Sequence, residues 1–414
     1  MRIRFYNCRI LSMDGDLNIT KGEIHTDGEK IAYVGTSKDN KVPFDKEIDC
    51  ENNLLMPSFK NMHTHSAMTF LRSQADDEPL QKWLTEVVFP AEAKLTEEKA
   101  YWYALLAIAE YLRGGISTCG DMYFLSSAAL KACQKTGFNV LISGAFNDFA
   151  QKDTTPEKEY LAYNDILPNV KYGAGFHAEY TTSLPLMEEI ASLSQKYAIP
   201  FFTHCQESEK ETKDCIKKYG KTPVALFKDI GLFENGGAIF HGVYLTEEDM
   251  DILKEKNISL VSNPASNIKL ANGIAPLKRA FEKGINIALG TDGAASNNAL
   301  DMFREMYLAC MLQKLKYSDA SALKAEEVLR WACCNSAKIT GFDNDCLREG
   351  KLADIIMIDM HTPNMLPERN IPVNLVYSGG VYNVKMTMVR GNILYYDDSF
   401  HMGEEIEKIY YMCK

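Results

Sequence analysis

Short apolar runs alternate with longer amphipathic stretches through most of the chain. Eight runs of strand length stand between residues 54 and 292, and segments between them, such as 97–113 and 246–256, have helical spacing. The runs cover residues 54–59, 115–120, 139–144, 170–176, 199–204, 237–241, 258–263 and 285–292. Eight strand–helix units are the number in a (β/α)8 TIM barrel, so the pattern predicts this α/β fold. A doubly wound sheet is the alternative, but no glycine-rich phosphate loop marks its first turn.

Both ends of the chain have a different pattern, in which apolar and polar residues alternate over short segments bounded by turns. Residues 2–7, 22–25 and 30–35 show it at the start, and residues 354–359 and 384–396 show it near the end. We therefore expect one small β-sandwich domain built from both termini. Its parts would be residues 1–55 and residues 349–414, the latter ending in a helix, around a barrel of residues 56–348.

Polar side chains gather at the ends of the predicted strands. Five of the chain's eight histidines, together with one aspartate, end such a run or follow it closely: His63, His65, His177, His204, His241 and Asp292. A single histidine at such a place is more often a hydrogen-bonded structural residue. TIM-barrel enzymes build their active sites at the carboxyl ends of the strands, so several histidines at equivalent positions indicate a site.

His63-Thr64-His65 is the sharpest local motif. Residues i and i+2 of a strand face the same side, so both imidazoles can reach one ion. An isolated H-x-H pair is a weak signal, but His204 and Asp292 can supply the remaining ligands from other strands. Three imidazoles and one carboxylate favour zinc, with iron, nickel or manganese as alternatives, and leave a position for water.

Composition and charge narrow the class of protein. With 46% hydrophobic and 24% charged residues the chain is an ordinary globular protein, and its net charge of −11 argues against binding to nucleic-acid phosphates. Neither a signal peptide nor an apolar run of 18 residues is present, so we expect a cytoplasmic protein without a membrane partner. The eleven cysteines include no C-x-x-C pair, which fits reduced thiols in the core.

Several longer motifs resemble a known family. Those that resemble the amidohydrolase superfamily are Met56-Pro57, Asn61-Met-His-Thr-His65, Thr203-His204-Cys-Gln-Glu207, His241 and Gly290-Thr-Asp-Gly-Ala-Ala-Ser-Asn297. Within it, Asn263-Pro-Ala-Ser-Asn-Ile-Lys-Leu270 and Val88-Phe-Pro-Ala-Glu92 are similar to the 5-methylthioadenosine/S-adenosylhomocysteine deaminases. The resemblance covers essentially the whole chain, including both β-rich ends.

The resemblance implies a metal-dependent deaminase that converts the 6-amino group of adenine nucleosides to a 6-oxo group and releases ammonia. The expected substrates are 5′-methylthioadenosine, adenosine and 5′-deoxyadenosine, with S-adenosylhomocysteine as a further candidate, and a homo-oligomer is expected. The implied ligands of one divalent metal ion are His63, His65, His204 and Asp292.

The resemblance also assigns roles around the metal. It makes Glu207 the acid that protonates the purine ring and Asp292 the group that accepts the proton of the attacking water. Glu92 would bind the ribose hydroxyls, His177 would contact the substrate, and His241 would lie beside the water.

Local sequence leaves some of these roles open. Residues i and i+3 of a straight strand face opposite sides, so Glu207 reaches a site at His204 only if the chain turns. Glu92 stands in a charged stretch that could be an exposed helix face, and Trp83 has the helical spacing of a core residue.

Two departures from related sites bear on the metal and the substrate. Some related barrels hold two metals bridged by a modified lysine at the end of strand four, but no lysine follows Lys171 there, which favours a single metal. Relatives that accept S-adenosylhomocysteine resemble one another in having arginines after strand three. The stretch 143–153 has none, and Lys152 is the nearby cation.

Other functions stay open. A deaminase or chlorohydrolase acting on guanine, a pterin or a triazine would share the metal site and differ in the pocket. The cytidine-deaminase type of site needs C-x-x-C ligands, which this chain lacks. A non-catalytic barrel would show broken motifs, whereas all four ligands and the acid are present.

Overall fold

The computed structural model describes residues 1–38, 42–74, 76–78, 80–149 and 154–414. Its central sheet has eight strands in the consecutive order β13 to β6, all paired in parallel. The strands are β6 (Phe59–Thr64), β7 (Ile116–Met122), β8 (Asn139–Ser143), β9 (Val170–Ala178), β10 (Phe201–Cys205), β11 (Gly237–His241), β12 (Ile258–Ser262) and β13 (Ile287–Leu289). The backbone N–H of Asp292, just past β13, donates to the carbonyl of His63 in β6 at 2.9 Å, so the two edges of the sheet meet and the barrel is nearly closed.

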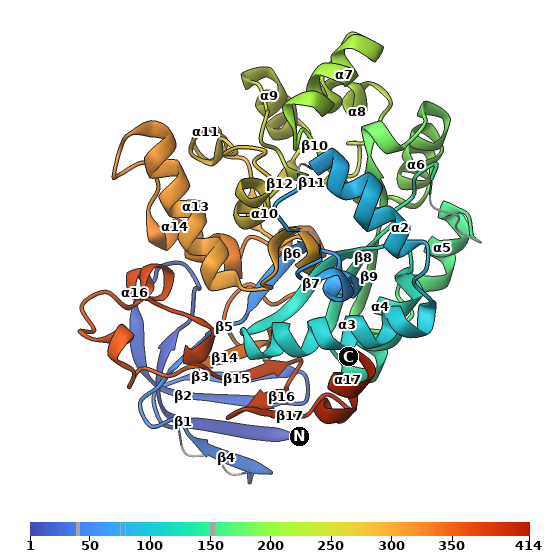
Figure 1. The fold of residues 1–414 in the computed structure, drawn as a ribbon. Coiled ribbons are helices and arrows are strands. Elements are labelled where there is room, and N and C mark those ends of the chain that lie inside the picture. The colour runs from blue at the N-terminus through green and yellow to red at the C-terminus, as the bar shows by residue number, and fades with distance from the viewer. Residues whose placement is uncertain (39–41, 75, 79, 150–153) are drawn as a thin grey trace.

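Helices surround this sheet (Figure 1). The longer ones are α3 (Glu97–Arg113), α4 (Ser126–Thr136), α5 (Pro156–Tyr163), α6 (Leu184–Tyr197), α7 (Glu209–Tyr219), α8 (Pro223–Asp229), α9 (Glu247–Glu255), α13 (Met302–Tyr317) and α14 (Ala325–Cys333). Shorter ones are α10 (Pro264–Lys269), α11 (Leu277–Glu282), α12 (Ala294–Asn297) and α15 (Ala337–Thr340). Two of the helices, α3 and α9, match the segments with helical spacing, and each begins after a threonine whose side chain accepts a backbone N–H, Thr96 and Thr246.

A further helical segment lies between β6 and α3 and crosses the carboxyl ends of the barrel strands (Figure 1). After the 3-10 turn η1 (Ser66–Leu71), it runs through α1 (Leu80–Trp83), the π-helical turn η2 (Leu84–Val88) and α2 (Phe89–Glu92). Trp83 packs in an apolar cluster with residues such as Met68 and Val88, so this tryptophan is a core residue. We call residues 80–92 the cover segment.

The ends of the chain form a second, mixed sheet of nine strands (Figure 1). The N-terminal part supplies β1 (Arg2–Leu11), β2 (Ile19–Asp27), β3 (Lys30–Gly35), β4 (Lys46–Asp49) and β5 (Leu54–Pro57). The C-terminal part supplies β14 (Ile355–Ile358), β15 (Val384–Val389), β16 (Asn392–Tyr396) and β17 (Ser399–Phe400), with α16 (Ile371–Tyr377) between them and α17 (Ile406–Met412) at the end. Side chains from most of these strands share one apolar cluster, so the sheet curls around its own core. The predicted fold, a TIM barrel with a small β-sandwich domain from both termini, is confirmed, and the terminal domain is built from one mixed sheet of nine strands.

The first predicted strand needs a correction. Residues 54–59 were expected to form the first barrel strand, but Leu54–Pro57 is β5, which pairs with β1 and β14 in the terminal sheet. The barrel strand is β6, so His63 lies within the strand and not after it. An apolar pattern marks both strands as buried but does not say which sheet each one joins.

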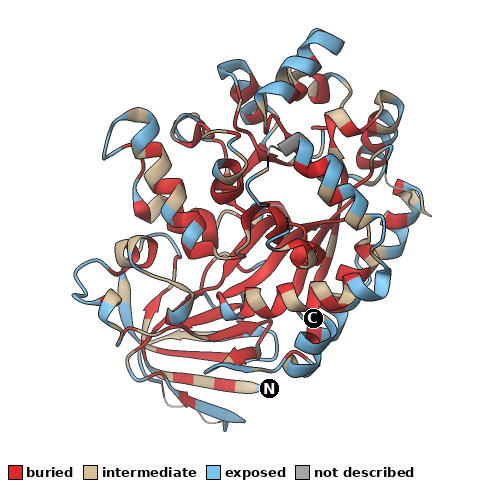
Figure 2. Cartoon of the chain, viewed as in Figure 1, coloured by how far each residue is buried: buried red, intermediate tan, exposed pale blue. Residues whose placement is uncertain are grey.

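Burial follows the two sheets. The barrel strands are buried along most of their length, while the outer faces of the surrounding helices are exposed (Figure 2). A separate apolar cluster that includes Met62, Phe202 and Phe240 packs among the barrel strands. Phe240 also stacks on the ring of His63 with a centroid distance of 3.9 Å, so this cluster forms the floor of the candidate site. Within the described residues, no helix is both long enough and apolar enough to cross a membrane.

Candidate functional site

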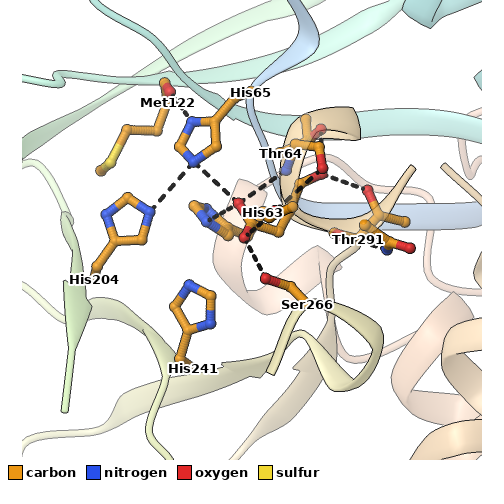
Figure 3. Close-up of polar contacts among 12 residues, drawn as sticks. His63, Thr64, His65, Met122, His204, His241, Ser266 and Thr291 are labelled. Carbon is orange, nitrogen blue, oxygen red and sulfur yellow. Dashed lines mark hydrogen bonds and ion pairs between the residues drawn. The ribbon is translucent and has the colours of Figure 1, made fainter. Parts of the chain in front are cut away.

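Three histidines and one aspartate meet at the carboxyl ends of the barrel strands. His63 lies in β6, His65 directly follows it and His204 lies in β10, while Asp292 follows β13. One ligand-type atom from each of the four residues lies within 4.8 Å of all the others. Figure 3 shows the rings of His63, His65 and His204 turned toward one centre, with His241 beside them. The fold thus brings the His63-Thr64-His65 motif together with His204 and Asp292, as the sequence predicts.

Hydrogen bonds to the far side of each ring fix the orientation of three imidazoles. His204 Nδ1 donates to the carbonyl of His177 at 2.6 Å, and His65 Nδ1 donates to the carbonyl of Met122. His241 Nδ1 bonds to Asn267 Oδ1 at 2.8 Å. Since these bonds occupy the Nδ1 hydrogens, the Nε2 lone pairs are left to face the site.

Asp292 is held by its own set of donors. Its Oδ2 accepts from the hydroxyls of Ser266 and Ser296, both at 2.7 Å, and its Oδ1 accepts from the backbone N–H of Gly293 at 2.8 Å. Its Oδ1 also lies 3.1 Å from His65 Nε2 and 3.4 Å from His63 Nε2. The backbone of Asp292 has φ +60°, a left-handed conformation that non-glycine residues adopt mainly where the surroundings impose it.

Burial and neighbouring groups set the charges of the cluster. Burial lowers the pKa of His63 to about 3 and that of His204 well below its ordinary value, so these rings are neutral. Burial would raise the pKa of Asp292, but the adjacent imidazoles of His63 and His65 hold it well below its ordinary value. Burial would lower the pKa of His65 as well, but the hydrogen bond and charge of Asp292 raise it to about 9. A metal cation bound between Asp292 and the histidines would take the place of the proton on His65.

The side chains fit a divalent metal ion. Among the described residues, neither ring nitrogen of His63 nor Nε2 of His241 has a hydrogen-bond partner, although all three atoms are buried. A buried polar atom without a partner is costly, and a metal ion would satisfy the histidine nitrogens that face it. Three imidazoles and a carboxylate form a ligand set that leaves one coordination position for water.

Glu207 reaches the site because the chain turns sharply after His204. Gln206 adopts φ +51°, and the carboxylate of Glu211 accepts the backbone N–H of Gln206 at 2.8 Å and that of Glu207 at 2.9 Å. Ser208 begins α7 and forms a capping box with the same glutamate. Glu211 therefore shapes the turn that brings Glu207 to the same side as His204.

The carboxyl group of Glu207 is buried beside the cluster. Asn272 Nδ2 donates to its Oε1 at 2.8 Å, and its Oε2 lies 3.9 Å from His241 Nε2. Burial raises the pKa of Glu207, with the charge of His241 acting in the opposite direction. A carboxylic acid held in its neutral form at this place can donate a proton to a bound ligand.

A pocket of about 520 Å³ opens beside the cluster, and both remaining candidates line it. Its polar residues include His65, Glu92, Asn147 and His177. Its apolar residues come from η1, from the cover segment and the residues after it, from the end of β7, and from the loops after β7 and β8: Met68, Leu84, Val88, Phe89, Leu95, Met122, Phe124, Leu125, Ala145 and Phe149. Among the described lining residues there is no lysine or arginine, and Lys152 lies outside the described residues.

Glu92 ends α2, so the cover segment carries it to the pocket instead of exposing it on a free helix face. Burial raises the pKa of Glu92 to about 7, although the nearby Tyr123 acts to lower it. The ring of His177 lies beside that of His204, with 4.7 Å between the two centroids. Burial lowers the pKa of His177 to about 4. A neutral imidazole and a carboxylate thus face the same pocket.

Sequence reasoning missed three residues at this site: Tyr123, Asn272 and Glu211. Tyr123 and Asn272 stand outside any motif, and no local signal points to them. Glu211 had a signal, because Ser208 and Glu211 have the spacing of a capping box.

Comparisons with known proteins agree with this geometry. A model of the amidohydrolase family matches residues 54–394. The 5-methylthioadenosine/S-adenosylhomocysteine deaminase of Caldicellulosiruptor saccharolyticus is 40% identical over 393 residues, which are 94% of this chain and 92% of that protein. The 5′-deoxyadenosine deaminase of Methanocaldococcus jannaschii is 36% identical over 402 residues, 95% of each chain. A crystal structure of an adenosine deaminase from Xanthomonas campestris with bound zinc is 28% identical, with a TM-score of 0.93, and covers 100% of this chain and 96% of that one.

Proposed function

The chain belongs to the amidohydrolase family, and we propose that it is a metal-dependent deaminase that replaces the 6-amino group of adenine nucleosides with oxygen. It is a hydrolase that acts on carbon–nitrogen bonds. One observation carries the proposal: a buried acid, Glu207, lies beside His241 at the cluster of His63, His65, His204 and Asp292, and the pocket that Glu92 lines reaches this cluster at His65. Relatives that act on adenine nucleosides support the substrate class.

The cofactor is a divalent metal ion, which His63, His65, His204 and Asp292 would hold. We favour one zinc ion, because the ligand set suits zinc and a related adenosine deaminase contains it. When bound, such an ion lowers the pKa of a coordinated water from 15.7 to about 7, which makes hydroxide available at neutral pH.

The protein groups then handle the protons of the reaction. Asp292 accepts a proton from the attacking water, and Glu207 donates its proton to the purine N1 as the new C6–O bond forms. The C6–N bond breaks as Asp292 passes its proton to the amino group, which leaves as ammonia, and the proton of the new C6 hydroxyl returns to Glu207 as the 6-oxo group forms. The hydrogen bond from His241 Nδ1 to Asn267 leaves His241 Nε2 as an acceptor that can orient the water.

Glu92 and His177 would bind the nucleoside. A carboxylate can accept hydrogen bonds from both ribose hydroxyls, and Glu92 lines the pocket within reach of such a ligand. His177 would contact the substrate from the strand next to His204.

The pocket supports an uncharged 5′ substituent. Most of its described lining residues are apolar, and none of them is a lysine or an arginine that could pair with a carboxylate. Stripping water from a carboxylate without a paired cation is costly. The preferred substrates would therefore be 5′-methylthioadenosine, 5′-deoxyadenosine or adenosine, ahead of S-adenosylhomocysteine.

Ammonia release across a substrate panel, with chloride release measured for a chlorinated triazine, tests the proposal. The panel contains the four adenine nucleosides and, for the alternative function, guanine, a pterin and a triazine. We expect turnover of the adenine nucleosides, and turnover restricted to the other compounds would refute the assignment. The location in the cytoplasm, the homo-oligomer and the lack of nucleic-acid binding stay predictions.

A further inference from the structure

Tyr123 is a pocket residue to which the proposed reaction gives no role. It directly follows β7, its side chain is 4% exposed, and it lines the pocket together with Glu92 and His65. Its hydroxyl is buried and has no hydrogen-bond partner among the described residues. A buried tyrosine hydroxyl normally finds a partner, because an unpaired one loses its bond to water without compensation.

The surroundings of Tyr123 restrict what that partner can be. Its ring packs in the apolar cluster with Met68, Trp83 and Val88, and against Phe124 with a centroid distance of 4.7 Å. These side chains offer the hydroxyl no strong hydrogen-bond acceptor. Glu92 is the acidic neighbour with the larger effect: burial first, and then the Glu92 carboxylate, raise the pKa of Tyr123 well above its ordinary value, while Asp121, which accepts from the backbone of Ser66, raises it less.

We propose that in the metal-loaded enzyme the Tyr123 hydroxyl donates a hydrogen bond to the Glu92 carboxylate and holds it in position for the two ribose hydroxyls. Tyr123 is thus a positioning residue that acts through Glu92. This inference rests on the proposed function in one respect, the assignment of the two ribose hydroxyls to Glu92.

Two features of Glu92 make such a partner necessary. Glu92 is the last residue of a four-residue helix in the cover segment, so the position of its side chain depends on its neighbours in the pocket. It must also be ionised to accept two hydroxyl groups, although burial disfavours the charge. A hydrogen bond from a phenol stabilises the carboxylate and leaves its remaining lone pairs to the diol.

The kinetic test compares the wild type with Tyr123→Phe on two substrates, adenosine and 2′,3′-dideoxyadenosine. We expect KM for adenosine to rise about tenfold, as for the loss of one favourable hydrogen bond. The kcat and the zinc content should stay within about twofold, since single polar contacts remote from the reacting atoms affect binding rather than chemistry. KM for the dideoxy substrate should not change. In a Glu92→Ala background, which removes the acceptor, Tyr123→Phe should add no further effect. Tyr172→Phe, which removes a hydrogen bond from a buried phenol to the Glu159 carboxylate outside this pocket, is the matched control and should leave both KM values unchanged.

An unchanged KM for adenosine in Tyr123→Phe, or an equal rise for both substrates, would overturn the inference. A crystal structure of the zinc-loaded wild type tests the contact without any need for activity. A Tyr123 hydroxyl within hydrogen-bond distance of a Glu92 oxygen supports it, and a hydroxyl bonded elsewhere refutes it. If the wild type turned over neither nucleoside, the proposed function would fail, while the crystal structure would still decide the contact.

Discussion

Asn272 Nδ2 donates a 2.8 Å hydrogen bond to Glu207 Oε1, while Glu207 Oε2 lies 3.9 Å from His241 Nε2. Because Oε1 is occupied as an acceptor, a proton on Glu207 resides on Oε2, the oxygen near His241. Burial raises the pKa of Glu207 and so favours this protonated form. Asn272 thereby keeps an acid directed at the position where the substrate would bind.

Glu207→Gln should leave the fold and the metal content intact while removing the proton donor. We expect kcat to fall about 10²–10⁴-fold, because general acid–base groups contribute that much to the rate. Asn272→Ala should lower kcat by about tenfold through loss of orientation, as for one hydrogen bond. Asn235→Ala is the matched control. Asn235 lies just before β11, away from the site, and its side-chain amide donates to the carbonyl of Ser194. Steady-state kinetics check all three, and near wild-type turnover in Glu207→Gln would show that the acid lies elsewhere.

Glu211→Ala should loosen the turn that carries Glu207. The backbone amides of Gln206 and Glu207 would lose their acceptor, so we expect the free energy of unfolding to fall by about 1–3 kcal/mol and kcat to fall with it. Urea denaturation and kinetics on the same preparation measure both. Glu209→Ala, on the same helix but in an exposed pair with Lys213, should change stability by less than about 0.5 kcal/mol. Equal effects of the two substitutions would contradict this account of the turn.

Acidic pH should weaken substrate binding through Glu92. Its pKa is raised to about 7, so the group is protonated, and a poorer acceptor for the ribose hydroxyls, at pH values below that. We therefore expect kcat/KM for adenosine to fall as the pH drops through about 7. The fall should be absent for 2′,3′-dideoxyadenosine and in Glu92→Gln, measured over pH 5–9. The same acidic limb for both substrates would assign the titration to another group.

The 5′ substituent should discriminate among substrates. We expect kcat/KM for 5′-methylthioadenosine to exceed that for S-adenosylhomocysteine by at least about tenfold, equivalent to ~1.4 kcal/mol. Phe149 is 73% exposed at the edge of the pocket, so Phe149→Arg should supply a cation and narrow the ratio, while Phe149→Leu should not. Equal or better use of S-adenosylhomocysteine by the wild type would refute this preference, and Lys152→Ala would then show whether that lysine binds the carboxylate.

The sequence was most informative where chemistry follows from local spacing. His63 and His65 stand two apart in one strand, and a barrel brings the ends of all its strands together, so His204 and Asp292 could be added from their positions alone. Apolar patterns could not separate β5 from β6, because both are buried and differ only in the strands with which they pair. The placement of Glu207 could not be predicted either, since it depends on the left-handed Gln206 and on Asn272, 65 positions away in the chain. The unpaired hydroxyl of Tyr123 is likewise a property of the packed pocket and of no motif.

Titration of the metal-free enzyme with zinc, followed through ammonia release from 5′-methylthioadenosine, tests the central claim most directly. We expect no turnover without metal, and a rise in activity that ends at one equivalent of zinc per chain. His63→Ala should lose nearly all of that rise, because a missing ligand weakens both metal binding and activation of water. A requirement for two equivalents, activity that does not depend on metal, or full activity in His63→Ala would contradict a single metal held by His63, His65, His204 and Asp292.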